Sequence, residues 1–253
     1  MTWHVQKRGA VAVVVFDRPP DNLMSYVLLD ALDGLLAEIA ADDDVTVVLL
    51  TGGVPGYFVG HADLDDVQQL VDGRPGPGDP DAWGRALGRL ALMPQPVIAA
   101  VNGQAWGGGC ELALACLMRI ASTSAHFRFV EVGAGAIPGA GGTQRLPRLV
   151  GASRAAYMIL SGCVVTAADA LEMGLVDAVR ADGNFLEEAL AWVAPMAAQP
   201  RHTVIAAKRA MLDGLAMTLG DGLENEQRIF RSVLTSPESR RMFGPARPAE
   251  PGV

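Results

Sequence analysis

Residues 96–116 read PVIAAVNGQAWGGGCELALAC, a stretch that joins an apolar run to three glycines and then to a helical segment carrying one acid, Glu111. The apolar run at 96–103 is typical of a buried strand. The glycines at 107–109 open the predicted helix, and free N–H groups at a helix N-terminus favour an anion or a developing oxyanion. Because glycines also permit close packing of a helix, spacing alone leaves both interpretations open.

Similar patterns surround this stretch. Apolar runs at 10–16 and 45–52 predict two more buried strands. The helix predicted between them has Ser25 as N-cap and these core-facing residues at helical spacing: Leu28, Leu32, Leu35, Leu36 and Ile39. A later helix begins with a capping box at Thr166 and ends before Gly174. Helical segments near 184–198, 201–214 and 218–235 complete a β/α body followed by a helical tail.

Composition restricts the class of protein. The chain has 253 residues, half of them apolar, and a formal charge of -8, which predicts a soluble globular protein of one large or two small domains. The absence of a basic stripe makes nucleic acid an unexpected partner. No run reaches the roughly 18 apolar residues that span a bilayer, so no membrane span is expected. With no targeting segment and three cysteines predicted to be reduced thiols, the expected compartment is the cytoplasm.

Several common motifs are missing from the sequence. No G-x-G-x-x-G follows a strand and no G-x-x-x-x-G-K-[ST] occurs, which argues against dinucleotide and ATP chemistry. The four histidines are scattered without the paired spacing of a zinc site, so no metal is expected. The segment GASRA at 151–155 is one glycine short of a nucleophile elbow and is typical of a helix N-cap. A serine hydrolase therefore stays only as a distant alternative.

Two acids lie beside glycine-rich segments. Glu111 falls in the first turn of its predicted helix, where the helix dipole alone would favour a carboxylate. Glu131 lies in FRFVEVGAGAIPGAGG at 127–142, between an aromatic segment and a second glycine-rich loop. An acid in such apolar surroundings should have a raised pKa suited to proton transfer. The alternative for Glu131 is an ion pair with Arg128 or Arg145.

Taken together, five segments resemble the enoyl-CoA hydratase/isomerase (crotonase) family, and the resemblance runs over nearly the whole chain. The segments are DRPPDNLMS at 17–25, YFVGHADL at 57–64, the stretch at 96–116, FRFVEVGAGAIPGAGGTQRLPRLVG at 127–151, and ADALEMGLVDAV at 168–179. Any one glycine cluster is unspecific, whereas this order of segments is specific.

The resemblance implies an α/β fold, a spiral of ββα repeats over residues 1–195. It implies that the helical region at 196–253 covers the site and mediates trimers or dimers of trimers. The implied substrate is an acyl-CoA thioester, with no cofactor, because coenzyme A is part of the substrate.

The resemblance also assigns roles to residues at matching positions. The backbone N–H groups of Ala62 and Gly108 would form an oxyanion hole for the thioester oxygen, as part of an acyl-CoA site that also includes Asp63 and Leu64. The two catalytic acids would be Glu111, which deprotonates water, and Glu131, which protonates C2. Gly139 would contact the shared water.

The reaction implied by two retained acids is hydration of a trans-2-enoyl-CoA. The alternatives are an isomerase or another acyl-CoA lyase of the same fold, or an acyl-CoA-binding paralogue without activity. One departure from the family pattern is His61, which stands where glycine is usual. Its side chain could narrow the acyl pocket, contact coenzyme A or simply face solvent.

Overall fold

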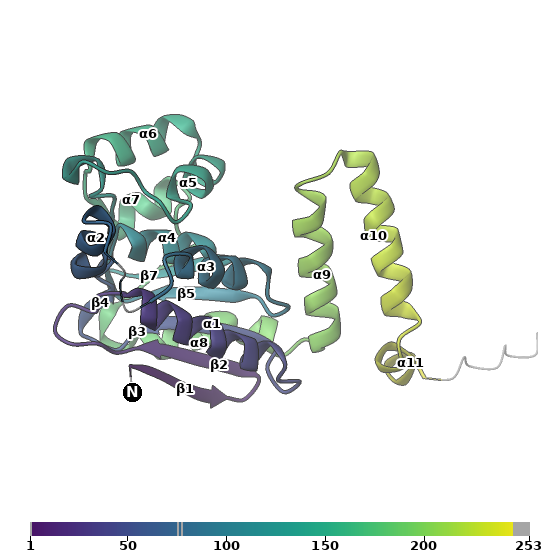
Figure 1. Ribbon diagram of the computed structural model, residues 1–253. Coiled ribbons are helices and arrows are strands. Elements are labelled where there is room, and N and C mark those ends of the chain that lie inside the picture. Colours follow the sequence, from purple (N-terminus) through teal and green to yellow (C-terminus); the bar gives the residue numbers. More distant parts are fainter. Residues whose placement is uncertain (1, 75, 77, 245–253) are drawn as a thin grey trace, which may run out of the picture. The chain divides into compact units, whose positions relative to one another are not determined.

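The computed structural model describes residues 2–74, 76 and 78–244, and the chain divides into two compact units, Met1–Ala198 and Gln199–Val253 (Figure 1). The strands are β1 Trp3–Arg8, β2 Val11–Phe16, β3 Val47–Gly52, β4 Gly56–Val59, β5 Val97–Val101, β6 Gly103–Trp106, β7 Met118–Ser122, β8 His126–Arg128, β9 Val165–Thr166 and β10 Ala178–Arg180. The helices of the first unit are α1 Tyr26–Ala40, α2 Leu64–Val71, α3 Ala82–Leu92, α4 Gly108–Ala115, α5 Gly142–Val150, α6 Ala152–Ser161, α7 Ala167–Glu172 and α8 Phe185–Ala197, with short 3-10 turns η1 Val132–Ala134 and η2 Asp182–Asn184.

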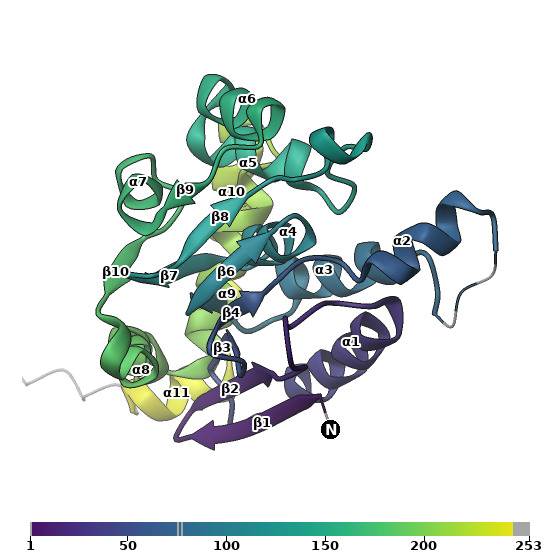
Figure 2. The same cartoon turned by 90° about the vertical axis from the view of Figure 1, so that its left-hand side faces the viewer.

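The first unit contains two sheets. Six strands form one sheet in the order β1-β2-β3-β5-β7-β10, parallel throughout except for the β1–β2 pair. Four strands form the other in the order β4-β6-β8-β9, with only the β8–β9 pair antiparallel. Figure 2 shows the four-stranded sheet with its strands side by side.

The chain alternates between the sheets, which produces the predicted spiral of ββα repeats. In each repeat the first strand joins the six-stranded sheet and the second joins the four-stranded one, before one or more helices follow: β3 and β4, β5 and β6, β7 and β8. One detail of the prediction is wrong. The strand expected at 96–103 ends at Val101, and a separate strand, β6, begins at Gly103 in the other sheet.

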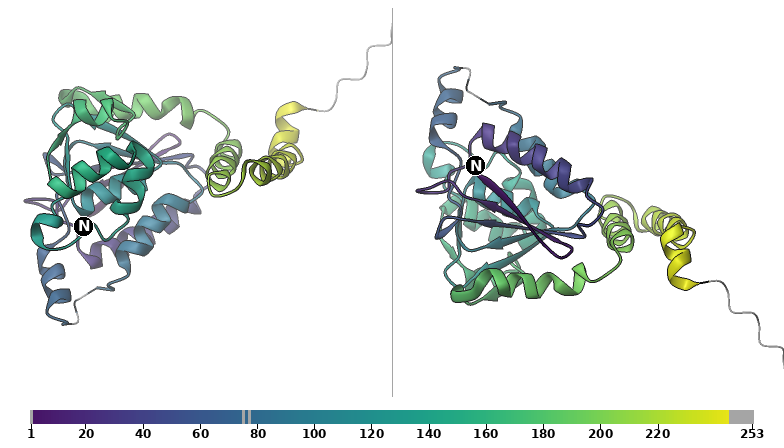
Figure 3. Two further views of the ribbon diagram at one scale, coloured as in Figure 1. Left: turned by 90° about the horizontal axis from the view of Figure 1, so that it is seen from above. Right: turned by 90° about the horizontal axis from the view of Figure 1, so that it is seen from below.

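The inner strands β3 and β5 of the six-stranded sheet are buried on both faces, and successive side chains of each strand point to opposite sides. Val47 and Leu49 of β3 pack in the cluster that contains Phe185 and Val193 of α8. Their neighbours on the same strand pack in the cluster that contains the buried residues of α1, α3 and α4. In Figure 3, α1 and α8 accordingly lie on opposite sides of the sheet.

Two predicted helix ends are confirmed by their hydrogen bonds. The Ser25 side chain accepts from the Leu28 amide at the start of α1. Thr166 and Asp169 form both halves of the capping box of α7, and Gly174 follows that helix with φ +78°. Residues 151–155 begin α6 with Gly151 as N-cap, so this segment is no nucleophile elbow.

The second unit is helical, with α9 Arg201–Gly214, α10 Leu219–Leu234 and α11 Pro237–Phe243. Helices α9 and α10 form a hairpin, and Thr218 caps α10 by accepting from the Asp221 amide. Its last residues, 245–253, lie outside the described part of the chain. Across the described residues, no helix has both the length and the apolar character needed to cross a membrane.

Candidate active site

A cavity of about 400 Å³ brings together most of the predicted site residues. It is bounded by the 61–70 segment, by the start of α4 and by the loop at 130–140. Six predicted residues line it: Ala62, Leu64, Gly108, Glu111, Glu131 and Gly139. The Asp63 side chain, the remaining one, instead accepts from the Asp65 amide at the start of α2 and pairs with Arg18 at 2.7 Å.

The three glycines at 107–109 serve different purposes. Gly107 has φ +49°, a conformation that favours glycine. A Cβ at Gly109 would lie 2.0 Å from the Val59 carbonyl oxygen, so this glycine permits close packing of α4 on β4. A Cβ at Gly108 would lie 2.4 Å from the Trp83 ring. The packing interpretation is therefore correct for Gly109 on β4 and for Gly108 on Trp83, and Gly108 also lines the cavity.

The Gly108 amide is free because of its place in the helix. Gly108 is the first residue of α4, and the first N–H groups of a helix have no intrahelical acceptor. The neighbouring Gly107 amide already donates to the Arg128 carbonyl at 2.8 Å. In the described part of the chain, no acceptor is found for the Gly108 N–H. This amide and the positive end of the α4 dipole can therefore act on a ligand oxygen.

The Ala62 amide is oriented by a single parallel bridge to Met24. The Met24 amide donates to the His61 carbonyl at 2.9 Å, and the Asp63 amide donates to the Met24 carbonyl at 2.7 Å. Within the His61–Ala62 peptide plane, N–H and C=O point in opposite directions. Because that carbonyl points at Met24, the Ala62 N–H points away from it, and Ala62 lines the cavity.

The 17–25 segment holds this bridge in place. Asn22 is fully buried, and its side-chain amide donates to the carbonyls of Phe16 and Phe58 at 3.0 and 2.6 Å. Its own carbonyl accepts from the Gly60 amide. Asn22 therefore ties the ends of β2 and β4 together directly beside Met24, which explains why an asparagine is useful in the DRPPDNLMS motif.

Glu111 is buried at 3% exposure, and one carboxylate oxygen, Oε1, accepts from the amides of Ala140 and Gly142, both at 2.7 Å. Burial raises its pKa to about 6; the charge of Glu131 adds to the rise, while the two amides and the Arg145 guanidinium oppose it. The position of Glu111 in the first turn of α4 is therefore more than a dipole effect. The carboxyl is fixed, largely desolvated and faces the cavity.

Glu131 has a different environment. Its Oε2 is buried without a hydrogen-bond partner, and burial raises the pKa of this carboxyl while nearby backbone amides oppose the rise. The alternative of an ion pair is wrong within the described chain. Arg128 donates to the Gly162 carbonyl and stacks on Trp106, and Arg145 donates to the Ala140 carbonyl. An acid with an orphan oxygen is favoured in its neutral form, which can donate a proton.

Glu111→Gln should raise the free energy of unfolding at pH 8 by roughly 2 kcal/mol. The folded state holds the Glu111 proton with a pKa of about 6 against 4.5 in the unfolded chain, so ionisation destabilises the fold. This destabilisation of the wild-type fold is absent below pH 4.5, where Glu111 is protonated in both states. It is complete above the folded pKa of about 6. Denaturant unfolding at pH 4 and pH 8 measures the difference, with exposed Glu172→Gln as control. An equal effect of Glu111→Gln at both pH values would contradict the assignment.

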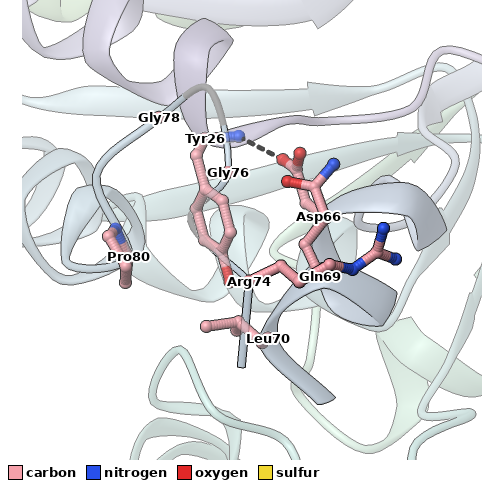
Figure 4. Close-up of a pocket in the computed structure, with 8 residues that line it drawn as sticks. All are labelled: Tyr26, Asp66, Gln69, Leu70, Arg74, Gly76, Gly78 and Pro80. Carbon is pink, nitrogen blue, oxygen red and sulfur yellow. Dashed lines mark hydrogen bonds between the residues drawn. The ribbon is translucent and has the colours of Figure 1, made fainter. Parts of the chain in front are cut away.

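A smaller side pocket of about 180 Å³ adjoins the cavity (Figure 4). The two share Tyr26, Leu70 and Pro80. The Tyr26 amide donates to the buried Asp66 carboxylate at 2.6 Å, and Figure 4 shows the ring of Tyr26 extending from there toward Leu70. Tyr26 therefore lines both the cavity and the side pocket, a role that its sequence context does not indicate.

Other wall residues also lacked a sequence signal. Trp83 reaches the cavity from α3, and Ile137 reaches it from the loop after η1. The Ala140 and Gly142 amides that hold Glu111 are backbone groups, so only the glycines of the 133–142 segment point to them. Two aromatic residues close in sequence to the acids are held elsewhere: Phe129 is fully buried, and Trp106 donates to His126 at 2.9 Å. Neither lines the cavity.

Over the described residues, no group of three or more His, Cys, Asp or Glu side chains is arranged to hold a metal ion. The three cysteines, Cys110, Cys116 and Cys163, form no disulfide. The chemically distinctive features of the cavity are its two acids and its two free amides.

The two alternating sheets form an α/β fold, and its cavity holds paired acids that can take part in acid–base chemistry. The chain belongs to the enoyl-CoA hydratase/isomerase family, whose model matches residues 6–249. It is 35% identical over 243 residues to the short-chain-enoyl-CoA hydratase of Clostridium acetobutylicum, covering 93% of this chain and 90% of that protein. It is 37% identical over 243 residues to the 2,3-dehydroadipyl-CoA hydratase of Escherichia coli, covering 93% and 91%.

Solved structures agree with the sequence comparison. The crystal structure of an enoyl-CoA hydratase from Bacillus anthracis aligns with a TM-score of 0.87 at 32% identity, covering 96% of this chain and 95% of that chain. The predicted crotonase fold is confirmed.

Proposed function

We propose that this chain is an enoyl-CoA hydratase that adds water reversibly and in the syn sense to trans-2-enoyl-CoA thioesters, giving 3-hydroxyacyl-CoA. The observation that carries the proposal is that Glu111 and Glu131 line one cavity with Ala62 and Gly108. Hydration needs a base for water, an acid for C2 and donors for the thioester oxygen, and these four residues supply all three. The names of the relatives support the same reaction.

The thioester oxygen would bind between the N–H groups of Ala62 and Gly108. Attack at C3 moves electrons through the conjugated system onto this oxygen, so the donors stabilise the enolate-like transition state more than the substrate. One such donor is typically worth roughly 3 kcal/mol. Both amides are already positioned by the fold, which means that little reorganisation is needed when the charge develops.

Glu111 would remove a proton from water as the water oxygen bonds to C3. A pKa of about 6 leaves this carboxylate mostly ionised at neutral pH while making it a stronger base than an exposed glutamate. Glu131 would then give its proton to C2, and exchange with solvent restores both acids. The charge of Glu131 raises the pKa of Glu111, so the two acids are proposed to titrate as a pair. Gly139 at the cavity wall is proposed to contact the attacking water.

No cofactor is proposed, because the thioester of coenzyme A itself activates the double bond. Asp63 and Leu64 are proposed to contribute to the acyl-CoA site together with Ala62 and Gly108. Leu64 lines the cavity and is 64% exposed, so it is available to an acyl chain. Asp63 acts through its contacts with Arg18 and α2.

The region at 196–253 is proposed to cover the site and to assemble the chain into trimers or dimers of trimers. Several large apolar side chains of its helical hairpin are exposed in the single chain, among them Leu215 and Leu219. Burial of such side chains against another copy would be favourable. A cytoplasmic location is proposed because none of the three cysteines forms a disulfide.

The proposed function is tested with purified protein and a panel of acyl-CoA thioesters. With crotonyl-CoA and longer 2-enoyl-CoAs, the absorbance of the conjugated thioester should fall and the product mass should rise by one water. Turnover of 3-enoyl-CoA to its 2-enoyl isomer without hydration would instead identify an isomerase. Binding of every thioester without turnover would identify a binding protein and overturn the proposal.

A further inference from the structure

His61 lies in the wall of the cavity immediately before Ala62. Its ring nitrogen Nδ1 is 2.6 Å from the carbonyl oxygen of Ala62. Because a carbonyl oxygen can only accept, Nδ1 must carry a hydrogen and donate it. The side chain is therefore held against the backbone by its own neighbour and is only partly exposed.

The bridge to Met24 also determines the direction of the accepting carbonyl. In an extended residue, the N–H and C=O groups point to the same side of the chain. The hydrogen bonds of Met24 use the His61 carbonyl and the Asp63 amide, so both polar groups of Ala62 point away from Met24. The Ala62 carbonyl thus lies on the side of the Ala62 amide. Its partial negative charge would oppose a developing oxyanion at that amide.

We propose that His61 is a positioning residue of the oxyanion hole. Its Nδ1–H donates to the Ala62 carbonyl and offsets the partial negative charge of that oxygen. The same hydrogen bond holds the 61–63 backbone so that the Ala62 amide stays directed into the cavity. This inference rests on the proposed function, because it assumes that the Ala62 amide receives the thioester oxygen. It gives a role to the residue that departs from the family pattern, and it requires no proton transfer by the imidazole.

The test uses substitutions that separate the two ring nitrogens. In His61→Asn, the side-chain amide nitrogen can occupy the place of Nδ1, whereas in His61→Gln it extends to the place of Nε2. His61→Ala removes both. We expect kcat for crotonyl-CoA hydration to fall about tenfold in His61→Ala and His61→Gln, with KM little changed, as for loss of one hydrogen bond. His61→Asn should recover most of the rate.

A spectroscopic measurement reports the oxyanion hole directly. The absorption maximum of a bound, slowly reacting aryl-conjugated enoyl-CoA moves to longer wavelength as its carbonyl is polarised. This red shift should be reduced in His61→Ala and His61→Gln and retained in His61→Asn. The control is His4→Ala, which changes a histidine of β1, outside the cavity-lining set.

Three results would overturn the inference while the wild-type hydratase activity stands. They are equal activity of His61→Ala and wild type, rescue by glutamine but not by asparagine, or a loss confined to KM, which would indicate a contact with coenzyme A. An inactive wild-type protein would instead refute the proposed function. If His61→Ala does not fold, the comparison of His61→Asn with His61→Gln still tests the inference, since both variants carry the same amide group.

Discussion

Glu131→Gln is expected to lower kcat for hydration of crotonyl-CoA by about a thousandfold, within the range for loss of a general acid. Glutamine has nearly the same shape but no transferable proton. The carboxyl of Glu131 has a raised pKa and an Oε2 atom without a partner, which together favour a protonated group ready to donate to C2. Because Ala62 and Gly108 are unchanged, KM should change little. Steady-state kinetics at neutral pH measures both constants.

The matched control for this substitution is Glu172→Gln, which makes the same chemical change at an exposed position of α7. It should keep the wild-type kcat. Thermal unfolding of both variants checks that the fold is intact. Comparable turnover of Glu131→Gln and wild type would exclude the proposed acid, and a loss of activity that follows a loss of folded protein would assign Glu131 a structural role.

The fold was predictable where a single stretch of sequence determines the local structure. Continuous apolar runs identified β2, β3 and β5, and a side-chain cap identified the start of α1. Strand β6 was missed because its four residues, GQAW, follow a single residue after β5 and show no β-branched pattern. What makes it a strand is its pairing with β4 and β8, which is a property of the tertiary structure.

The same distinction between local sequence patterns and tertiary contacts applies to the candidate site. Glu111, Glu131 and Gly108 were predicted because motifs carry them, and the cavity does bring them together. Trp83 was missed since nothing in the periodicity of α3 reveals that its first turn faces Gly108. The amide of Ala140 was missed because backbone donors have no side-chain signature. Sequence patterns thus located the two acids and Gly108, whereas the groups that surround and orient them depend on the tertiary structure.

Glu111→Gln should also lower kcat for hydration by about a thousandfold, because hydration needs both acids. Proton exchange at C2 separates the roles of the two acids. A saturated thioester such as butyryl-CoA has no group to eliminate, and exchange of its C2 proton needs only a base at C2 and the oxyanion donors. The proposed roles therefore predict that Glu111→Gln keeps this exchange and that Glu131→Gln loses it.

Mass spectrometry of butyryl-CoA incubated in D₂O with each variant measures the exchange. Glutamine at position 111 can still accept from the amides of Ala140 and Gly142, so the loop at 133–142 should keep its place in the variant. Exchange lost in Glu111→Gln and kept in Glu131→Gln would reverse the two roles, and loss in both would mean that neither acid acts at C2 alone. Because the charge of Glu131 raises the pKa of Glu111, a pH profile reports on the pair, and the assignment of roles must come from such single-site chemistry.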